Sequence, residues 1–199
     1  MYWLEKTLHF SFLLAPKTET GRSLEGRPIH RVSVSGNQRE GANVWLVCGL
    51  HAREWASPLA CLHIIKALVE IRWSWPSQPE LQKINFQIVP LANPDSYVFS
   101  MDQLKYRQKR KNMADSGCSD PLHNGVDLNR NFPVGFNLSS NGSDSDGVSG
   151  VCSNMYGGEL PFSEPETKTL RDALTQATPW LFIDLHCCFG AWLTPPVSR

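Results

Sequence analysis

The sequence lacks three features that would each place it in a distinctive class of protein. No stretch is apolar for the length that a transmembrane helix needs. No charge is in excess, because 19 acidic residues balance 19 basic ones, and this argues against nucleic acid or an anionic membrane as the main partner. The six cysteines are too few for a disulfide scaffold. What remains is an ordinary globular chain of 199 residues, long enough for one domain with a substantial core.

The N-terminus does not resemble a secretory signal. Its apolar piece, residues 10–15, is short, and charged residues precede it. Two glycosylation sequons, beginning at Asn137 and Asn141, nevertheless lie in a stretch rich in Gly, Ser, Asn and Asp that is typical of a surface loop. We therefore expect an extracellular protein, with residues 1–20 as an atypical N-terminal segment and residues 21–199 as the domain.

The distribution of apolar residues predicts an α/β fold. Alternating and continuous apolar runs predict four strands, at residues 26–34, 43–50, 84–91 and 180–185. One helix is expected to begin at Ser57 and Pro58, and a second at Ser163, where Ser163 and Glu166 have the spacing of a capping box. Strands that alternate with helices predict a mixed, largely parallel sheet flanked by helices.

Side chains that can bind a metal follow two of the predicted strands. His51 and Glu54 come directly after the strand at 43–50, and His186 follows the strand at 180–185. A His-x-x-Glu pair alone is common in polar turns, but ligand-binding groups of α/β sheets gather beyond the carboxyl ends of strands. Two imidazoles and one carboxylate suit a catalytic zinc ion, because three protein ligands leave a fourth position open for water. The sequence therefore favours a zinc site.

The segment Gly-Leu-His-Ala-Arg-Glu-Trp, at residues 49–55, resembles the first zinc motif of the zinc metallocarboxypeptidases of the pancreatic carboxypeptidase A/B type. Further matches follow in chain order: Gly-Arg-Ser-Leu-Glu-Gly-Arg-Pro at 21–28, Asn-Pro-Asp at 93–95, Gly-Val-Asp-Leu-Asn-Arg-Asn-Phe at 125–132, Tyr-Gly-Gly at 156–158, Ser-Glu-Pro-Glu at 163–166 and Ile-Asp-Leu-His at 183–186. The resemblance implies a carboxypeptidase-like fold and zinc held by His51, Glu54 and His186, the ligand types known for carboxypeptidase A. It also implies a monomeric enzyme that removes C-terminal residues from peptides.

The resemblance assigns further roles around the metal. Asn129 and Arg130 match the family's pair that holds the C-terminal carboxylate of the substrate, a task that suits the guanidinium fork. Arg110 matches the arginine that stabilises the developing oxyanion, although Lys109 stands where an aromatic residue is usual. Arg107 offers a competing register. We prefer Arg110, and we expect most of the basic residues around it to be solvated.

The cysteines are expected to play different parts. Cys118 and Cys152 flank the carboxylate-binding loop and resemble a disulfide pair of the family. Cys48 and Cys61 are expected to be buried thiols of the core. The adjacent cysteines at residues 187–188 follow a candidate metal ligand, but neighbouring side chains on a strand point to opposite faces, so we do not expect them to bind the metal.

The sequence after His186 contains no Glu, Asp or Tyr. Peptide hydrolysis needs a group that takes a proton from water and delivers it to the leaving amine, and the family uses a glutamate and a nearby tyrosine beyond its last zinc ligand. Glu164 and Glu166 are expected in the first turn of a helix, and Glu159 in a loop. The resemblance therefore implies a C-terminally truncated domain with impaired hydrolysis and an unpaired sheet edge. The alternative is a non-catalytic zinc- and peptide-binding fragment or splice product of the same family.

Overall fold

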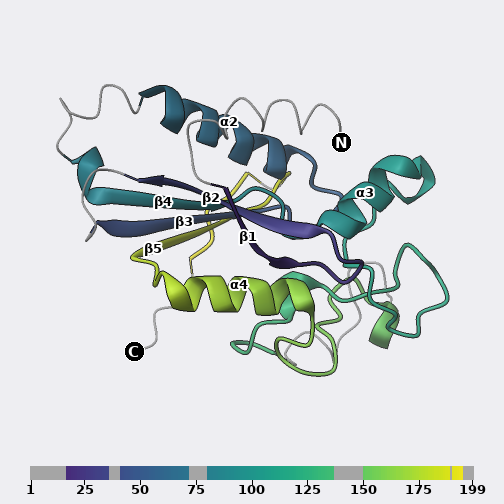
Figure 1. Cartoon of the computed structure of the whole chain (residues 1–199). Coiled ribbons are helices and arrows are strands. Elements are labelled where there is room, and N and C mark those ends of the chain that lie inside the picture. The colour runs from purple at the N-terminus through teal and green to yellow at the C-terminus, as the bar shows by residue number, and fades with distance from the viewer. Residues whose placement is uncertain (1–16, 36–40, 72–79, 137–149, 189, 195–199) are drawn as a thin grey trace.

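A computed structural model describes residues 17–35, 41–71, 80–136, 150–188 and 190–194 of the chain (Figure 1). The two sequons and the apolar piece at residues 10–15 lie outside these residues. The strands are β1 (Lys17–Arg22), β2 (Pro28–Ser35), β3 (Ala42–Cys48), β4 (Ile84–Val89) and β5 (Leu181–Leu185). The helices are α2 (Ala56–Ile71), α3 (Pro94–Asp102) and α4 (Pro165–Gln176), with short 3₁₀ turns η2 (Leu81–Lys83), η3 (Leu104–Tyr106), η4 (Leu128–Arg130) and η5 (Gly150–Cys152).

The strands form one mixed sheet in the order β1-β2-β4-β3-β5. The pairings β1–β2 and β2–β4 are antiparallel, whereas β4–β3 and β3–β5 are parallel. This confirms the mixed α/β sheet. The strand β1 was not predicted, because its sequence, Lys-Thr-Glu-Thr-Gly-Arg, does not alternate apolar with polar residues. β5 lies at one edge of the described sheet, where Leu181 and Phe182 are each 42% exposed.

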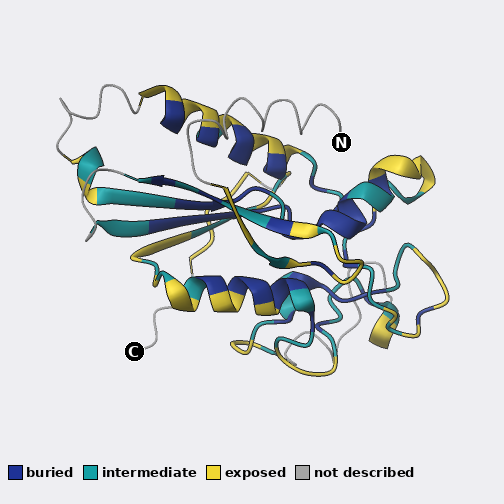
Figure 2. Cartoon of the chain, viewed as in Figure 1, coloured by how far each residue is buried: buried dark blue, intermediate teal, exposed yellow. Residues whose placement is uncertain are grey.

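Helices cover both faces of the sheet (Figures 1 and 2). The helix α2 packs on one face and α4 on the other, and each encloses a separate hydrophobic cluster. On one face, α2 packs Leu62, Ile65 and Val69 against side chains such as Leu46 of β3. On the other face, Leu170 and Ala173 of α4 join a separate cluster with Trp45 and Val47. Successive side chains of β3 therefore alternate between the two clusters. This double burial explains why the strand is almost wholly apolar.

Cys48 and Cys61 form a disulfide, so the prediction of two core thiols was wrong. The bond joins the last residue of β3 to α2, and both residues are fully buried. Sequence alone could not show it, because the pairing depends on how the helix returns across the sheet. The second disulfide, Cys118–Cys152, is the pair that the family resemblance implied.

The predicted capping box at the start of α4 was also wrong. The N-cap residue is Glu164, and Ser163 instead accepts a hydrogen bond from Asn131 and donates one to Glu164. Glu166 does not turn back to cap the helix, because its carboxylate accepts the backbone N–H of Leu24. The helix runs from Pro165 to Gln176.

Two lysines of the basic run near Arg110 are buried, contrary to the prediction of a solvated face. Lys109 is 2% exposed and donates to the carbonyl oxygens of Pro121 and Asn124. Lys111 is fully buried and donates to the carbonyl oxygens of Val151 and Ser153. Backbone carbonyls of the surrounding loops thus replace water around both ammonium groups. A pattern of charge in the sequence cannot indicate this, because the acceptors come from irregular segments.

The buried carboxylate of Glu166 predicts a pH-dependent contribution to the stability of the fold. Burial raises its pKa above the ordinary glutamate value of 4.5, although hydrogen bonds from Leu24 and Asn112 partly oppose this rise. The folded state therefore binds this proton more tightly than the unfolded chain does, and the resulting stabilisation is present at low pH and lost as the pH rises above about 4.5. We expect Glu166→Gln to gain free energy of unfolding relative to the wild type over that rise, because Gln has no charge to bury. Urea denaturation at a series of pH values measures the difference.

The control for this experiment is Glu70→Gln, since Glu70 is exposed on α2 and forms a surface ion pair with Lys66. Its difference from the wild type should vary little between pH 4 and pH 7, as for ordinary surface ion pairs. A pH-independent difference for Glu166→Gln would contradict the raised pKa.

Candidate metal centre

The candidate ligands meet because the strands before them run parallel. The register pairs Cys48, the last residue of β3, with Leu185, the last residue of β5. His51 and His186 follow these two strand ends, so they emerge at the same edge of the sheet. Gly49 has φ +68°, a conformation that side chains disfavour, and it turns the chain sharply after β3. A Cβ atom there would also come within 2.8 Å of the Leu91 side chain.

Ser57, at the start of α2, joins the two strand ends. Its hydroxyl accepts a hydrogen bond from the backbone N–H of Gly49 at 3.0 Å and donates one to the carbonyl oxygen of Leu185. The residue is buried, so these bonds are shielded from water. One side chain thus fixes the segment that carries His51 and Glu54 against the segment that carries His186.

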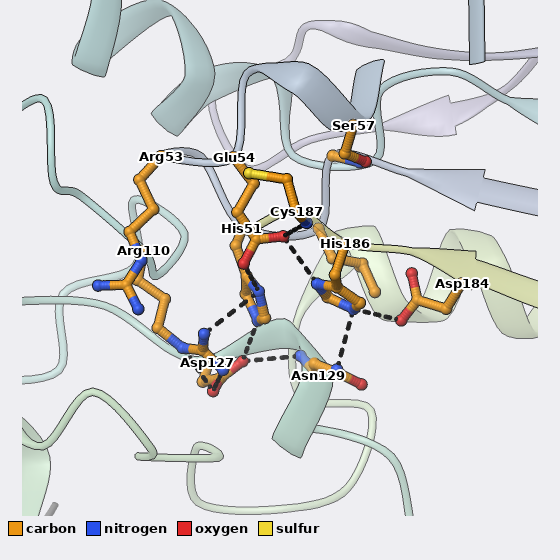
Figure 3. Close-up of polar contacts among 12 residues, drawn as sticks. His51, Arg53, Glu54, Ser57, Arg110, Asp127, Asn129, Asp184, His186 and Cys187 are labelled. Atoms are coloured by element: carbon orange, nitrogen blue, oxygen red, sulfur yellow. Dashed lines mark hydrogen bonds and ion pairs between the residues drawn. The ribbon is translucent and has the colours of Figure 1, made fainter. Parts of the chain in front are cut away.

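The three candidate ligands converge on one point (Figure 3). Nδ1 of His51 lies 2.8 Å from Oε1 of Glu54, and Nδ1 of His186 lies 2.8 Å from Oε2 of the same carboxylate. One ligand atom from each residue lies within 4.8 Å of the others. His51 and Glu54 are buried, whereas His186 is exposed, so the cluster opens on one side. In the described part of the chain, this is the only group of three or more such side chains close enough to share a metal ion.

Each imidazole turns its other nitrogen to a carboxylate. Nε2 of His51 lies 3.0 Å from Oδ1 of Asp127, and Nε2 of His186 lies 2.7 Å from Oδ2 of Asp184. In metalloproteins, carboxylates are common partners of the second ring nitrogen of metal-bound histidines. The donor set and its outer partners therefore fit a zinc ion.

The charges of the cluster stabilise one another. Burial alone would raise the pKa of Glu54, but hydrogen bonds from His186 and His51 outweigh it and hold the pKa well below its usual range. Burial likewise opposes the charge of Asp127, whose pKa is nevertheless lowered by His51 and Arg110. For His186, burial favours the neutral ring, but Asp184 and Glu54 raise the pKa to about 10. A proton and a metal ion compete for Nδ1 of such a ring.

Of the two candidate oxyanion arginines, only Arg110 reaches the cluster. Its Nη1 lies 3.3 Å from Nδ1 of His51, while Nε and Nη2 both donate to Oδ2 of Asp127, at 3.0 and 2.8 Å. The guanidinium of Arg107 instead stacks over the ring of Trp55, 3.7 Å from its centroid, and donates to the carbonyl oxygen of Arg53.

Asn129 and Arg130 lie together on η4 beside the cluster. The side-chain nitrogen Nδ2 of Asn129 is 3.1 Å from Nε2 of His186, so this residue reaches the metal centre directly (Figure 3). Arg130 is half-buried, and its Nη1 donates to the backbone carbonyl oxygen of Asn129. The turn is held from within by Asp127, whose carboxylate accepts the backbone N–H of Asn129.

The remaining candidates lie away from the centre. The sulfur of Cys187 points away from both imidazoles (Figure 3), although its backbone N–H donates to Oε2 of Glu54 at 3.2 Å. The carboxylates of Glu164 and Glu166 both accept from the side-chain amide of Asn112. Glu159 is exposed and lies in a loop. Among the described residues, therefore, Glu54 is the only glutamate in contact with the two histidines.

Three residues of the site were not singled out from the sequence. Asp127 and Asp184 lie within the family-like motifs, and Asp184 stands two residues before His186, the spacing that places two side chains on one face of a strand. That spacing could have indicated a partner for the imidazole. No local signal identifies Ser57, because its acceptor comes from a strand far along the chain.

Known proteins resemble this chain in sequence and in fold. Residues 13–198 match the zinc carboxypeptidase family. Mast cell carboxypeptidase A of Mus musculus is 31% identical over 170 residues, which are 84% of this chain and 38% of that protein. Carboxypeptidase B2 of Homo sapiens is 31% identical over 175 residues, or 86% of this chain and 39% of that protein.

A solved structure supports the same relationship. The crystal structure of carboxypeptidase A from Helicoverpa armigera has 31% sequence identity and a TM-score of 0.74, covering 92% of this chain and 43% of that one. The chain thus spans about two fifths of the length of these relatives. None of the described helices has the length and apolar character that crossing a membrane requires. By sequence and by fold, the chain belongs to the zinc carboxypeptidase family.

Proposed function

We propose that the chain forms the zinc-binding and carboxylate-binding part of a metallocarboxypeptidase site, which acts on the C-termini of peptides or proteins. The observation that carries the proposal is the convergence of His51, Glu54 and His186 within 4.8 Å, beside Arg110 and the Asn129–Arg130 turn. Two imidazoles and a carboxylate leave a zinc ion one open position for water or substrate. When bound, zinc would polarise a carbonyl group and lower the pKa of its water.

The chain's own residues would orient the peptide. Arg130 carries a guanidinium that can grip a terminal carboxylate through two parallel hydrogen bonds, and the amide of Asn129 can add a third. Arg110 would face the carbonyl group of the bond to be cleaved. Two of its nitrogens are held on Asp127, so its charge is oriented before substrate arrives. This combination supports a site for free C-termini rather than for internal peptide bonds.

The described site has no glutamate that is free to transfer a proton. The one glutamate at the cluster, Glu54, is needed as a ligand, and Glu164 and Glu166 are engaged with Asn112. No other described glutamate contacts the histidines to take a proton from water. We therefore propose that hydrolysis by this chain is impaired, and the alternative function is binding of zinc and peptide without turnover.

The proposed compartment is extracellular. Two disulfides, Cys48–Cys61 and Cys118–Cys152, support an oxidising environment, in which such bonds form and persist.

The metal centre predicts a specific pattern of zinc binding. We expect the wild type to bind one zinc ion, whereas His51→Ala and His186→Ala should each lose most of the affinity, because only two ligands remain. Competition with a chromogenic chelator measures the affinity. His63→Ala is the matched control, since His63 is exposed on α2 and its ring bonds to the backbone carbonyl oxygen of Leu59. Full zinc stoichiometry in His186→Ala would contradict the ligand assignment.

The carboxylate grip predicts a difference between free and blocked peptide ends. We expect the zinc-loaded chain to bind a blocked dipeptide with a free C-terminus, and Arg130→Ala to weaken that binding by about 10–100-fold, the loss of one or two charge-assisted hydrogen bonds. The amidated dipeptide should bind weakly to both proteins. Isothermal titration calorimetry compares the four affinities. Equal affinity for the acid and the amide in the wild type would argue against the grip.

The impaired chemistry is tested with the same zinc-loaded protein. We expect little or no hydrolysis of blocked dipeptides, because Glu54 is the only described glutamate at the two histidines and is needed as a ligand, which leaves no glutamate there to take a proton from water. Release of the C-terminal amino acid, followed by chromatography, is the measurement. Hydrolysis by the wild type that disappears in His51→Ala would contradict the proposed impairment and establish the chain as an enzyme.

A further inference from the structure

Asp184 contacts one candidate ligand and nothing else in the cluster. Its Oδ2 lies 2.7 Å from Nε2 of His186, on the side of the ring opposite Glu54. Asp184 lies in β5, and His186 directly follows the last residue of that strand, two positions on, which is the spacing of side chains on one face. The contact therefore joins two residues of one short segment at the end of the strand.

The other carboxylate oxygen of Asp184 lowers the stability of the folded state. Oδ1 is buried and has no hydrogen-bond partner within the described part of the chain. A buried acceptor without a partner destabilises the folded state. Stability alone therefore does not account for this side chain, whereas its contact with His186 gives it a role at the metal centre.

A second side chain competes for the same nitrogen. Nδ2 of Asn129 lies 3.1 Å from Nε2 of His186 and can only donate a hydrogen bond. If Nε2 accepted from Asn129, the ring would carry its proton on Nδ1, and that nitrogen could not bind a metal. If Nε2 carries the proton and donates to Asp184, Nδ1 has a free lone pair. The two neighbours therefore favour opposite tautomers of His186.

We infer that Asp184 is a positioning residue that fixes the metal-binding tautomer of His186 and leaves the amide of Asn129 available for a peptide carboxylate. This inference rests on the proposed zinc site and deepens it. One hydrogen bond serves both tasks, because a protonated Nε2 cannot accept from Asn129. Asp127 makes the corresponding contact with His51, but no competing donor amide is found at that nitrogen among the described contacts.

The experiment measures zinc affinity in a double-mutant cycle. We expect Asp184→Ala to weaken zinc binding by about 10–100-fold, as for other outer partners of metal-bound histidines. Removing the competing amide as well, in Asp184→Ala with Asn129→Ala, should recover part of that loss, while Asn129→Ala alone should change the affinity little. Asp172→Ala is the matched control, because Asp172 is exposed on α4 and forms an ion pair with its neighbour Arg171.

Two spectroscopic measurements support the cycle, and the first of them needs only the wild type. Long-range nitrogen–proton NMR of the zinc-loaded chain should find the ring proton of His186 on Nε2. The visible spectrum of the cobalt-loaded protein should differ between the wild type and Asp184→Ala, and not between the wild type and Asp172→Ala.

The outcomes separate this inference from the zinc site itself. Wild-type zinc affinity in Asp184→Ala, together with lost affinity in His186→Ala, would overturn the role of Asp184 and keep the metal centre. An unprotonated Nε2 in the zinc-loaded wild type would overturn it as well. Unchanged affinity in both Asp184→Ala and His186→Ala would mean that the proposed zinc site is wrong.

Discussion

The parallel pairing of β3 with β5 is the constraint on which the site depends. It sets Cys48 beside Leu185 and so brings the chain that follows each strand to one edge. A shift of one residue would turn the side chains of β5 to the opposite face of the sheet. Ser57 stabilises this register directly, because its single hydroxyl bonds to the backbone of both segments. The position of the metal centre is therefore decided by backbone geometry before any ligand is bound.

The cluster then depends on a balance of buried charge. Asp127 is fully buried, and a carboxylate in that position is tolerated only because His51 and Arg110 bond to it. The same carboxylate orients Arg110 and caps the η4 turn by accepting the backbone N–H of Asn129. One buried acid thus connects the candidate metal ligand His51, the candidate oxyanion arginine and the η4 turn. Such shared contacts make the effects of single substitutions here non-additive.

The sequence was informative where the physical signal is local. Apolar runs identified the strands that are buried on one or both faces, and His51, Glu54 and His186 were recognisable because they follow such strands. The polar strand β1 gave no apolar pattern, and its place comes from pairing with β2. The partners of the ligands were harder to predict, since their contacts join residues as far apart as His51 and Asp127.

The burial of polar groups also could not be predicted from the sequence. Lys109 and Lys111 look like surface residues in the sequence, yet loop carbonyls enclose them. The Cys48–Cys61 disulfide and the role of Glu166 beneath α4 also depend on where a helix packs. The family resemblance supplied the Cys118–Cys152 pair, but it could not supply features that depend on packing in this chain. Local sequence pattern thus predicts helices, strands and candidate ligands, whereas tertiary contacts decide which polar side chains are buried and what they bond to.

Formation of the site and chemical competence are physically separable in this fold. The ligands, Arg110 and the η4 turn are held by the sheet edge and by Asp127, without any contribution from Glu164 or Glu166. Those two acids are tied to Asn112, and Glu166 also accepts the backbone of Leu24, so recruiting either to the metal centre would break a buried network. Breaking such a network costs more than the loss of one exposed contact, because the abandoned donors remain buried. The network around Asn112 therefore keeps Glu164 and Glu166 from serving as the base, while the binding site forms independently of them.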